Sequence, residues 1–199
     1  MAWDRVGRAA QSAYVAAAAG LVALITIGLF FTLGQPWGTL NDTALLVMTL
    51  AIGPIMLGSY ELGGVTPLWP ARLSLATGLG AIAVWCAIQA AMILGVVTFD
   101  YDHAATGAFA VEDLALIVIG AWLTGAPPLA GPWLPGRLKI LGALAGLGFV
   151  LTGAGLILGG VNHPLTWVGG VGYQVLFPIW AYLVARVFSS RASTPRPAG

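Results

Sequence analysis

The chain has 199 residues, of which 59% are hydrophobic and only 8% are charged, with eight basic and seven acidic side chains. An ordinary soluble domain carries about 25% charged residues, and so few charges cannot cover the surface of a water-soluble protein. The composition therefore excludes a soluble globular domain, a disordered chain and a nucleic-acid-binding protein with a basic face. It predicts a multi-pass membrane protein.

Six segments are long and apolar enough to cross a bilayer, which takes about 20 residues of helix. In chain order they cover residues 12–34, 43–60, 73–99, 109–125, 138–159 and 164–188. Their apolar stretches are continuous rather than alternating, which is typical of helices and not of a transmembrane β-barrel. We predict an all-α fold with a single six-helix transmembrane domain over residues 1–188, followed by a disordered cytoplasmic tail over residues 189–199.

The basic residues predict the orientation of this domain. With six spans, both termini and the second and fourth loops lie on one side of the membrane. That side holds all eight basic residues of the chain: Arg5, Arg8, Arg72, Arg137, Lys139, Arg186, Arg191 and Arg196. Because basic residues are retained on the cytoplasmic side, both termini are predicted to be cytoplasmic.

Small residues and prolines indicate how the helices pack. The fifth span carries glycines on two helical faces: Gly142, Gly146 and Gly153 on one, and Gly148, Gly155 and Gly159 on the other. Membrane helices associate closely at such faces, so this span is predicted to pack on two sides at the centre of the bundle. Pro54 and Pro178 each remove a backbone hydrogen bond and are expected to kink their helices.

Few polar side chains lie inside the predicted spans. Gln89 in the third span and Gln174 in the sixth need hydrogen-bond partners and are expected to bond across helices. Thr124 and Thr152 are expected to bond to carbonyl groups of their own helices. Glu61, at the cytoplasmic end of the second span, is expected to pair with Arg72 or Arg137. No acidic or basic residue is expected at mid-membrane depth, which argues against a proton relay.

The opposite, outer side holds a candidate metal site. Asp100, Asp102 and His103 crowd one short loop, and His163 lies on another outer turn. Carboxylates and imidazoles together are the ligands of a divalent transition metal such as Zn²⁺. The alternative is that the loop acids are solvated turn residues.

Three further acidic residues belong to the same outer side. Asp42 is expected in the first outer turn, and Glu112 and Asp113 open the predicted fourth span. Acids in the first turn of a helix interact favourably with the helix dipole, so Glu112 and Asp113 also have a purely structural explanation. The three residues would nevertheless give an outer mouth an acidic character that attracts cations.

Enzyme motifs are absent from the sequence. It contains no G-x-S-x-G, no H-E-x-x-H and no P-loop lysine motif. No cofactor is predicted, and an enzyme is the least favoured class of function.

Three short motifs carry a resemblance to known proteins. They are GQPWGTLND at residues 34–42, GRL at residues 136–138 and NHPL at residues 162–165. With these motifs the chain resembles a loose group of small six-helix bacterial membrane proteins of unknown function. The resemblance implies the fold and a bacterial cytoplasmic membrane, and it implies no activity and no catalytic residue.

The sequence leaves three functions open. The first is a non-enzymatic accessory or scaffold subunit, which associates with itself or with another membrane protein and binds no nucleic acid. The second is a small carrier or channel-like protein that takes a cation or small solute through an acidic outer mouth. The third is a metal-dependent membrane enzyme. A polar cavity running from Asp42 toward Glu61 would favour the carrier, and a solid core would favour the accessory subunit.

Overall fold

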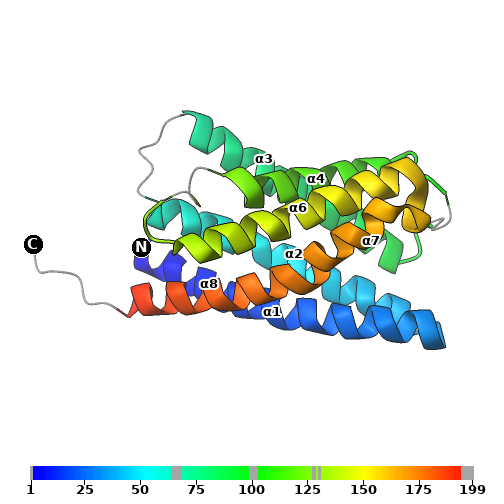
Figure 1. Cartoon of the computed structure of the whole chain (residues 1–199), viewed down its shortest axis with the longest axis horizontal. Helices are drawn as coiled ribbons and strands as arrows, with labels where there is room; N and C mark the ends of the chain where they lie inside the picture. The colour runs from blue at the N-terminus through cyan, green and yellow to red at the C-terminus, as the bar shows by residue number, and fades with distance from the viewer. Residues whose placement is uncertain (1, 64–68, 99–102, 127–128, 130, 194–199) are drawn as a thin grey trace, which may run out of the picture.

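A computed structural model of the chain describes residues 2–63, 69–98, 103–126, 129 and 131–193, and of residues 2–4 it describes only the backbone. This part of the chain is helical and contains no strand. The helices are α1 (Ala2–Leu33), α2 (Trp37–Leu62), α3 (Trp69–Ile93), α4 (Ala108–Gly125), α6 (Gly136–Gly159), the short η1 (Gly160–Asn162), α7 (Pro164–Gly170), the π-helical η2 (Val171–Leu176) and α8 (Phe177–Ala192). Figure 1 shows them in colours that follow the chain.

Six helices of this structure are long and apolar enough to cross a membrane. The sixth of them consists of α7, η2 and α8, which continue as one helix over Pro164–Ala192. The protein is therefore a multi-pass helical membrane protein. Several predicted boundaries differ from the structure, and α1, α2 and α3 all begin earlier than predicted. Helix α3 ends at Ile93 rather than at residue 99, and Gly95 follows with a positive φ of 70°. The last helix continues to Ala192, into the segment predicted as a tail.

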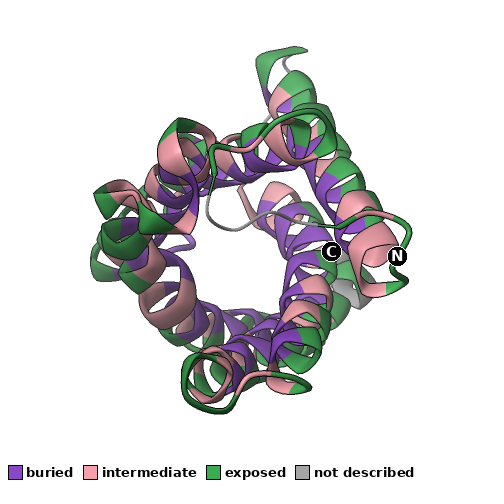
Figure 2. Ribbon diagram, turned by 90° about the vertical axis from the view of Figure 1, so that its right-hand side faces the viewer, coloured by how far each residue is buried: buried purple, intermediate pink, exposed green. Residues whose placement is uncertain are grey.

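The helices form a closed ring in the order of the chain. Each packs against the next, from α1 and α2 round to α6 and α7, and α8 returns to pack along α1. Viewed along the bundle, the buried residues face the inside of this ring (Figure 2). Helix α6 is one member of the ring, between α4 and the last helix. The prediction that it lies at the centre of the bundle is wrong, because the chain closes a ring instead of surrounding one helix.

Glycines stand where two helices of the ring approach most closely. A Cβ atom added to Gly146 of α6 would lie 2.5 Å from the carbonyl oxygen of Gly120 in α4. On the other side of α6, Gly148 is in direct contact with the backbone of Gly172 in η2. At the seam that closes the ring, Gly20 of α1 lies against the ring of Pro178 in α8. A larger side chain at any of these positions would separate the two helix backbones.

The half of the ring that holds the termini is filled by apolar side chains. Ile52, Ile55 and Met56 of α2 and Val184 and Phe188 of α8 are completely buried. The indole Nε1 of buried Trp180 donates a 3.0 Å hydrogen bond to the carbonyl oxygen of Leu138, which joins α8 to α6. This half has the packed core that a stable bundle needs.

The predicted ion pair of Glu61 forms with a different partner. Arg5, near the start of α1, approaches Glu61 at the end of α2, with Nη1 and Oε1 2.6 Å apart. The prediction that Glu61 pairs with Arg72 or Arg137 is wrong, because α1 packs directly along α2 and brings Arg5 closer.

Candidate functional site

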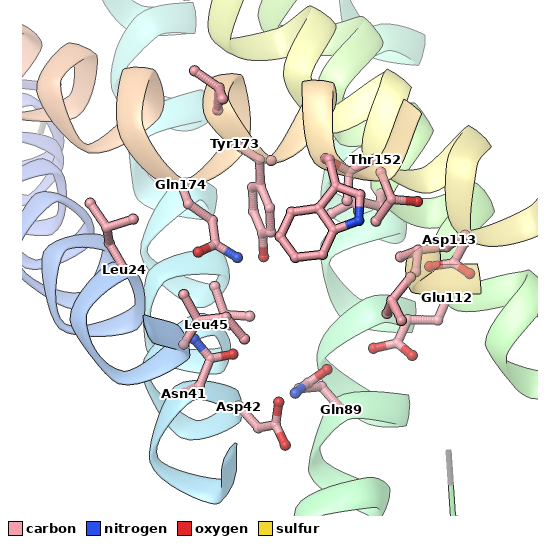
Figure 3. Close-up of a pocket in the computed structure, with 18 of the residues that line it drawn as sticks. Leu24, Asn41, Asp42, Leu45, Gln89, Glu112, Asp113, Thr152, Tyr173 and Gln174 are labelled. Carbon is pink, nitrogen blue, oxygen red and sulfur yellow. The ribbon is translucent and has the colours of Figure 1, made fainter. Parts of the chain in front are cut away.

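The half of the ring away from the termini encloses a cavity of about 480 Å³. All six spanning helices contribute lining residues, among them Leu24 of α1, Asp42 of α2, Gln89 of α3, Glu112 of α4 and Thr152 of α6. The last helix contributes Tyr173 and Gln174 from η2. Figure 3 shows these side chains directed into the same space.

Five of the polar residues singled out in the sequence meet in this cavity: Asp42, Gln89, Glu112, Asp113 and Gln174. They come from four different helices and are separated in the chain by up to two thirds of its length. In Figure 3 the carboxyl group of Asp42 and the carboxamide of Gln89 face each other, and Glu112 points toward the same space.

The acidic residues lie deeper than the sequence predicts. Helix α2 begins at Trp37, so Asp42 is more than one turn inside the helix rather than in the preceding loop. Helix α4 begins at Ala108, so Glu112 and Asp113 lie beyond its first turn, with exposed fractions of 6% and 4%. The predictions of an outer-turn position and of a first-turn dipole interaction are therefore wrong for these residues.

Several buried polar atoms of the cavity have no hydrogen-bond partner in the protein. They include Oδ2 of Asp113 and Oγ1 of Thr152. Asp113 and Thr152 are only 4% and 7% exposed. An unpaired buried polar group costs about 1–3 kcal/mol, and a ligand that supplies the missing partner recovers it. These buried polar atoms lie in the walls of the cavity, beside its largely apolar lining.

The electrostatic character of the cavity is acidic. Its lining contains the carboxyl groups of Asp42, Glu112 and Asp113, and no lysine, arginine or histidine among the residues that the structure describes. Glu112 and Asp113 are adjacent in the chain and both are buried, so negative charges on the two would repel each other. A positively charged group in the cavity would relieve this repulsion.

Neighbouring contacts hold the polar wall in place. The side chain of Asn41 donates a 2.7 Å hydrogen bond from Nδ2 to the carbonyl oxygen of Ala23, which joins α2 to α1 beside the cavity. The ring of Tyr173 meets the buried ring of Phe149 edge to face, with centroids 4.5 Å apart. Phe149 in turn contacts Phe177, so these aromatic rings connect Tyr173 to the packed half of the bundle.

The last helix is irregular where it lines the cavity. Its π-helical turn η2 covers Val171–Leu176, and Pro178 follows in α8. A π turn alters the direction of side chains along a helix and is frequent at functional sites. The predicted effect of Pro178 thus coincides with a local change of helix geometry, whereas α2 continues through Pro54.

One wall of the cavity is apolar and belongs to two helices. On α1 it consists of Leu24, Ile27, Gly28 and Phe31, at the spacing of one helix face. On α7 and η2 it includes Trp167, Gly170 and Val171. The rings of Phe31 and Trp167 meet between the two helices, with centroids 5.6 Å apart.

Only two of the four candidate metal ligands, His103 and His163, lie in the described part of the chain. His163 precedes α7, and its Nδ1 accepts a 3.3 Å hydrogen bond from the backbone N–H of Leu165. His103 is exposed. Among the described residues, no three His, Cys, Asp or Glu side chains are placed to hold a metal ion. Asp100 and Asp102 lie outside the described residues, so the four-residue site stays a prediction.

Sequence reasoning missed part of the cavity wall. Asn41, Thr152 and Tyr173 were not candidates for a site, and Thr152 was expected to bond to its own helix, which its unpartnered Oγ1 does not do. Thr124 does bond as expected, to the carbonyl oxygen of Gly120 at 2.8 Å. The adjacent polar pair at positions 173 and 174, inside an apolar span, was the one signal that pointed to this wall. Glu61 lies at the other end of the bundle and takes no part in the cavity.

The fold and the cavity define an integral membrane protein with a pocket between its spanning helices, lined by acidic and amide side chains among apolar ones. Comparisons with protein-family models, with curated proteins and with solved structures found no match to the chain. The arguments for its function therefore rest on the pocket itself.

Proposed function

We propose that this protein is a carrier that binds a small organic cation in the acidic pocket between its helices. The observation that carries the proposal is the presence of three carboxyl groups in one pocket whose described lining includes no basic residue. We further propose a bacterial cytoplasmic membrane as its location, with both termini in the cytoplasm, so that the pocket lies in the outer half of the bilayer.

The energetics of burial favour a cationic ligand. A carboxylate taken out of water costs several kcal/mol unless an opposite charge or several hydrogen bonds compensate it. Among the described residues that line the pocket, none supplies such a charge around Asp42, Glu112 and Asp113. A bound cation would supply it.

The aromatic side chains of the pocket favour an organic ammonium ion over a metal ion. Trp85, Trp167 and Tyr173 all line the pocket. Aromatic faces attract ammonium groups, and quaternary ammonium ions are commonly recognised by them. The described carboxylates are not placed to coordinate a metal together, as noted above.

A carrier explains the irregular helix better than a scaffold does. Substrate sites of membrane carriers are commonly formed where a spanning helix departs from regular geometry, as η2 does here. An accessory or scaffold subunit, the first expectation from the sequence, needs no acidic pocket. The pocket includes Asp42 but does not reach Glu61, so a bound cation would have to pass the packed half by a change of conformation. Association with itself or with another membrane protein stays a prediction.

Thermal unfolding of the purified protein in a non-ionic detergent tests the binding step. We expect benzyltrimethylammonium to raise the Tm saturably, since a ligand at 100 times its Kd adds about 2.7 kcal/mol to stability. The variant Glu112→Gln should lose this shift, whereas Glu61→Gln, an acidic residue outside the pocket, should keep it. An unchanged Tm in the parent protein, or an equal shift in Glu112→Gln, contradicts the proposal.

Exchange in proteoliposomes tests the carrier step. Vesicles loaded with unlabelled benzyltrimethylammonium should take up the labelled cation faster than protein-free vesicles, and Glu112→Gln should abolish the difference. Binding without exchange would leave a binding protein and would contradict the carrier.

A further inference from the structure

The ring of helices is weakly closed next to the pocket. Helix α8 packs along α1 over much of its length, whereas η2 touches α1 at few points and α7 hardly at all. In Figure 1 the ends of α1 and α7 away from the termini stand apart, while α8 runs beside α1. The apolar wall of the pocket lies along this opening, which we call the α1–α7 seam and define by Gly28, Phe31, Trp167, Gly170 and Val171.

Residues of the seam belong to the pocket and to the outer surface at the same time. Phe31, Trp167 and Val171 line the pocket, yet they are 56%, 56% and 57% exposed. In a spanning helix, exposed apolar side chains such as these face lipid rather than water. The pocket therefore reaches the lipid-facing surface between α1 and α7.

The polarity of the pocket changes from the seam inward. The seam contributes aromatic, aliphatic and glycine residues, and the opposite wall contributes Asp42, Gln89 and Glu112. Figure 3 shows Leu24 on the α1 side, Gln174 near it, and Asp42, Gln89 and Glu112 farther away. A molecule that matches both walls has a cationic head and an apolar tail.

We propose that the ligand is an amphiphilic cation dissolved in the membrane, with an ammonium head at Asp42 and Glu112 and an alkyl tail in the α1–α7 seam. This inference rests on the proposed function and adds the chemical class of the ligand. An anionic amphiphile such as a fatty acid fits the seam equally well, but its head would meet three carboxyl groups and no described basic residue.

Equilibrium binding of three probes to the protein in lipid nanodiscs tests the inference. The probes are decyltrimethylammonium, tetramethylammonium, which has the head alone, and decyl sulfate, which has the tail with the opposite charge. Each binding curve is corrected with empty nanodiscs for partition into lipid. We expect decyltrimethylammonium to bind at least about tenfold more tightly than tetramethylammonium, since burial of each methylene strengthens binding about fourfold. Decyl sulfate should show no saturable binding.

A pair of glycine variants locates the tail. A Cβ atom at Gly28 in the seam meets no atom within 4 Å, and the same holds for exposed Gly80 on α3, which does not line the pocket. Both Gly28→Phe and Gly80→Phe should therefore fold. Gly28→Phe should weaken decyltrimethylammonium binding at least about tenfold and leave tetramethylammonium binding within about twofold, while Gly80→Phe should change neither.

The outcomes separate this inference from the proposed function. If Gly28→Phe and Gly80→Phe bind decyltrimethylammonium equally, or if decyl sulfate binds as tightly, the tail does not lie in the seam and the inference is wrong. If tetramethylammonium still binds in that case and Glu112→Gln abolishes its binding, the proposed function stands. If neither cation binds the parent protein, both are wrong.

Discussion

At the scale of single residues, the buried carboxyl groups of the pocket lower the stability of the folded protein. Glu112 and Asp113 are neighbours in the chain and both are buried, and Asp42 lines the same pocket. Such clusters persist in proteins when function requires them, and they leave the ligand-free state less stable than it could be.

Replacing one of these carboxyl groups should stabilise the ligand-free protein. Glu112→Gln keeps the size of the side chain but removes a carboxyl group that is buried beside Asp113. We expect the free energy of unfolding to rise by about 1 kcal/mol or more, seen as a higher Tm in detergent without any organic cation. A lower Tm would mean that Glu112 has a compensating interaction in the folded protein.

Glu61→Gln is the matched comparison for this experiment. Glu61 pairs with Arg5 near the surface, where the two side chains are 26% and 55% exposed. Exposed ion pairs contribute between about 0 and 1 kcal/mol, so this variant should have an unchanged or slightly lower Tm. An increase as large as that of Glu112→Gln would show that the stabilisation does not come from the pocket.

The sequence indicated several residues of the pocket, but it did not indicate how far inside their helices these residues lie. Asp42, Gln89 and Gln174 stood out because polar residues are rare in this chain. Hydropathy marks where an apolar run begins, whereas α2 begins earlier, at Trp37, and α4 begins at Ala108. Acidic residues at the margin of an apolar run therefore turned out to be inside helices, facing a cavity that the sequence does not reveal.

At the scale of helices, close backbone contacts hold the ring together. Gly120 of α4 and Gly146 of α6 face each other, and a Cβ atom on either one would lie 2.5 Å from the carbonyl oxygen of the other. Membrane helices gain stability from such contacts because lipid gives little hydrophobic drive for their association.

A single methyl group at this contact should destabilise the bundle. In Gly146→Ala the new Cβ atom meets backbone, which cannot move without displacing α4 from α6. We expect a loss of about 1–3 kcal/mol, measured as a lower Tm in detergent. In Gly80→Ala the new Cβ atom meets nothing within 4 Å, so the gain in helix propensity should leave that variant as stable or more stable by up to about 1 kcal/mol. Equal effects in both variants would contradict a special role for the α4–α6 contact.

The irregular turn in the last helix was only partly predictable. Pro178 predicted a disturbance, since it lacks the backbone N–H of a regular helix. The disturbance takes the form of the π turn η2, which precedes the proline and directs Tyr173 and Gln174 toward the cavity (Figure 3). Within this turn Gly172 is in close contact with Gly148 of α6, a residue that is distant in the chain.

At the scale of the whole molecule, the number of spans follows from hydropathy but the ring does not. Six apolar segments of sufficient length were recognisable because each is continuous. The closure of the ring depends on contacts between α1 and α8, the two ends of the chain, such as that of Gly20 with Pro178. The ring leaves room for a pocket in one half, and packed side chains fill the other.

The orientation of this ring can be tested by labelling of single cysteines in intact cells. Cys86 is the chain's single cysteine and is buried, so Cys86→Ala gives a suitable background. Ala104 and Arg191 are both exposed and lie at opposite ends of the bundle, on the pocket side and the terminal side respectively. Because basic residues gather at the terminal end, we expect that end to be cytoplasmic. A membrane-impermeant maleimide should then label Ala104→Cys in intact cells, and Arg191→Cys only after lysis. The reverse pattern would place the acidic pocket in the inner half of the bilayer, and the proposed carrier would then receive its cation from the cytoplasmic side.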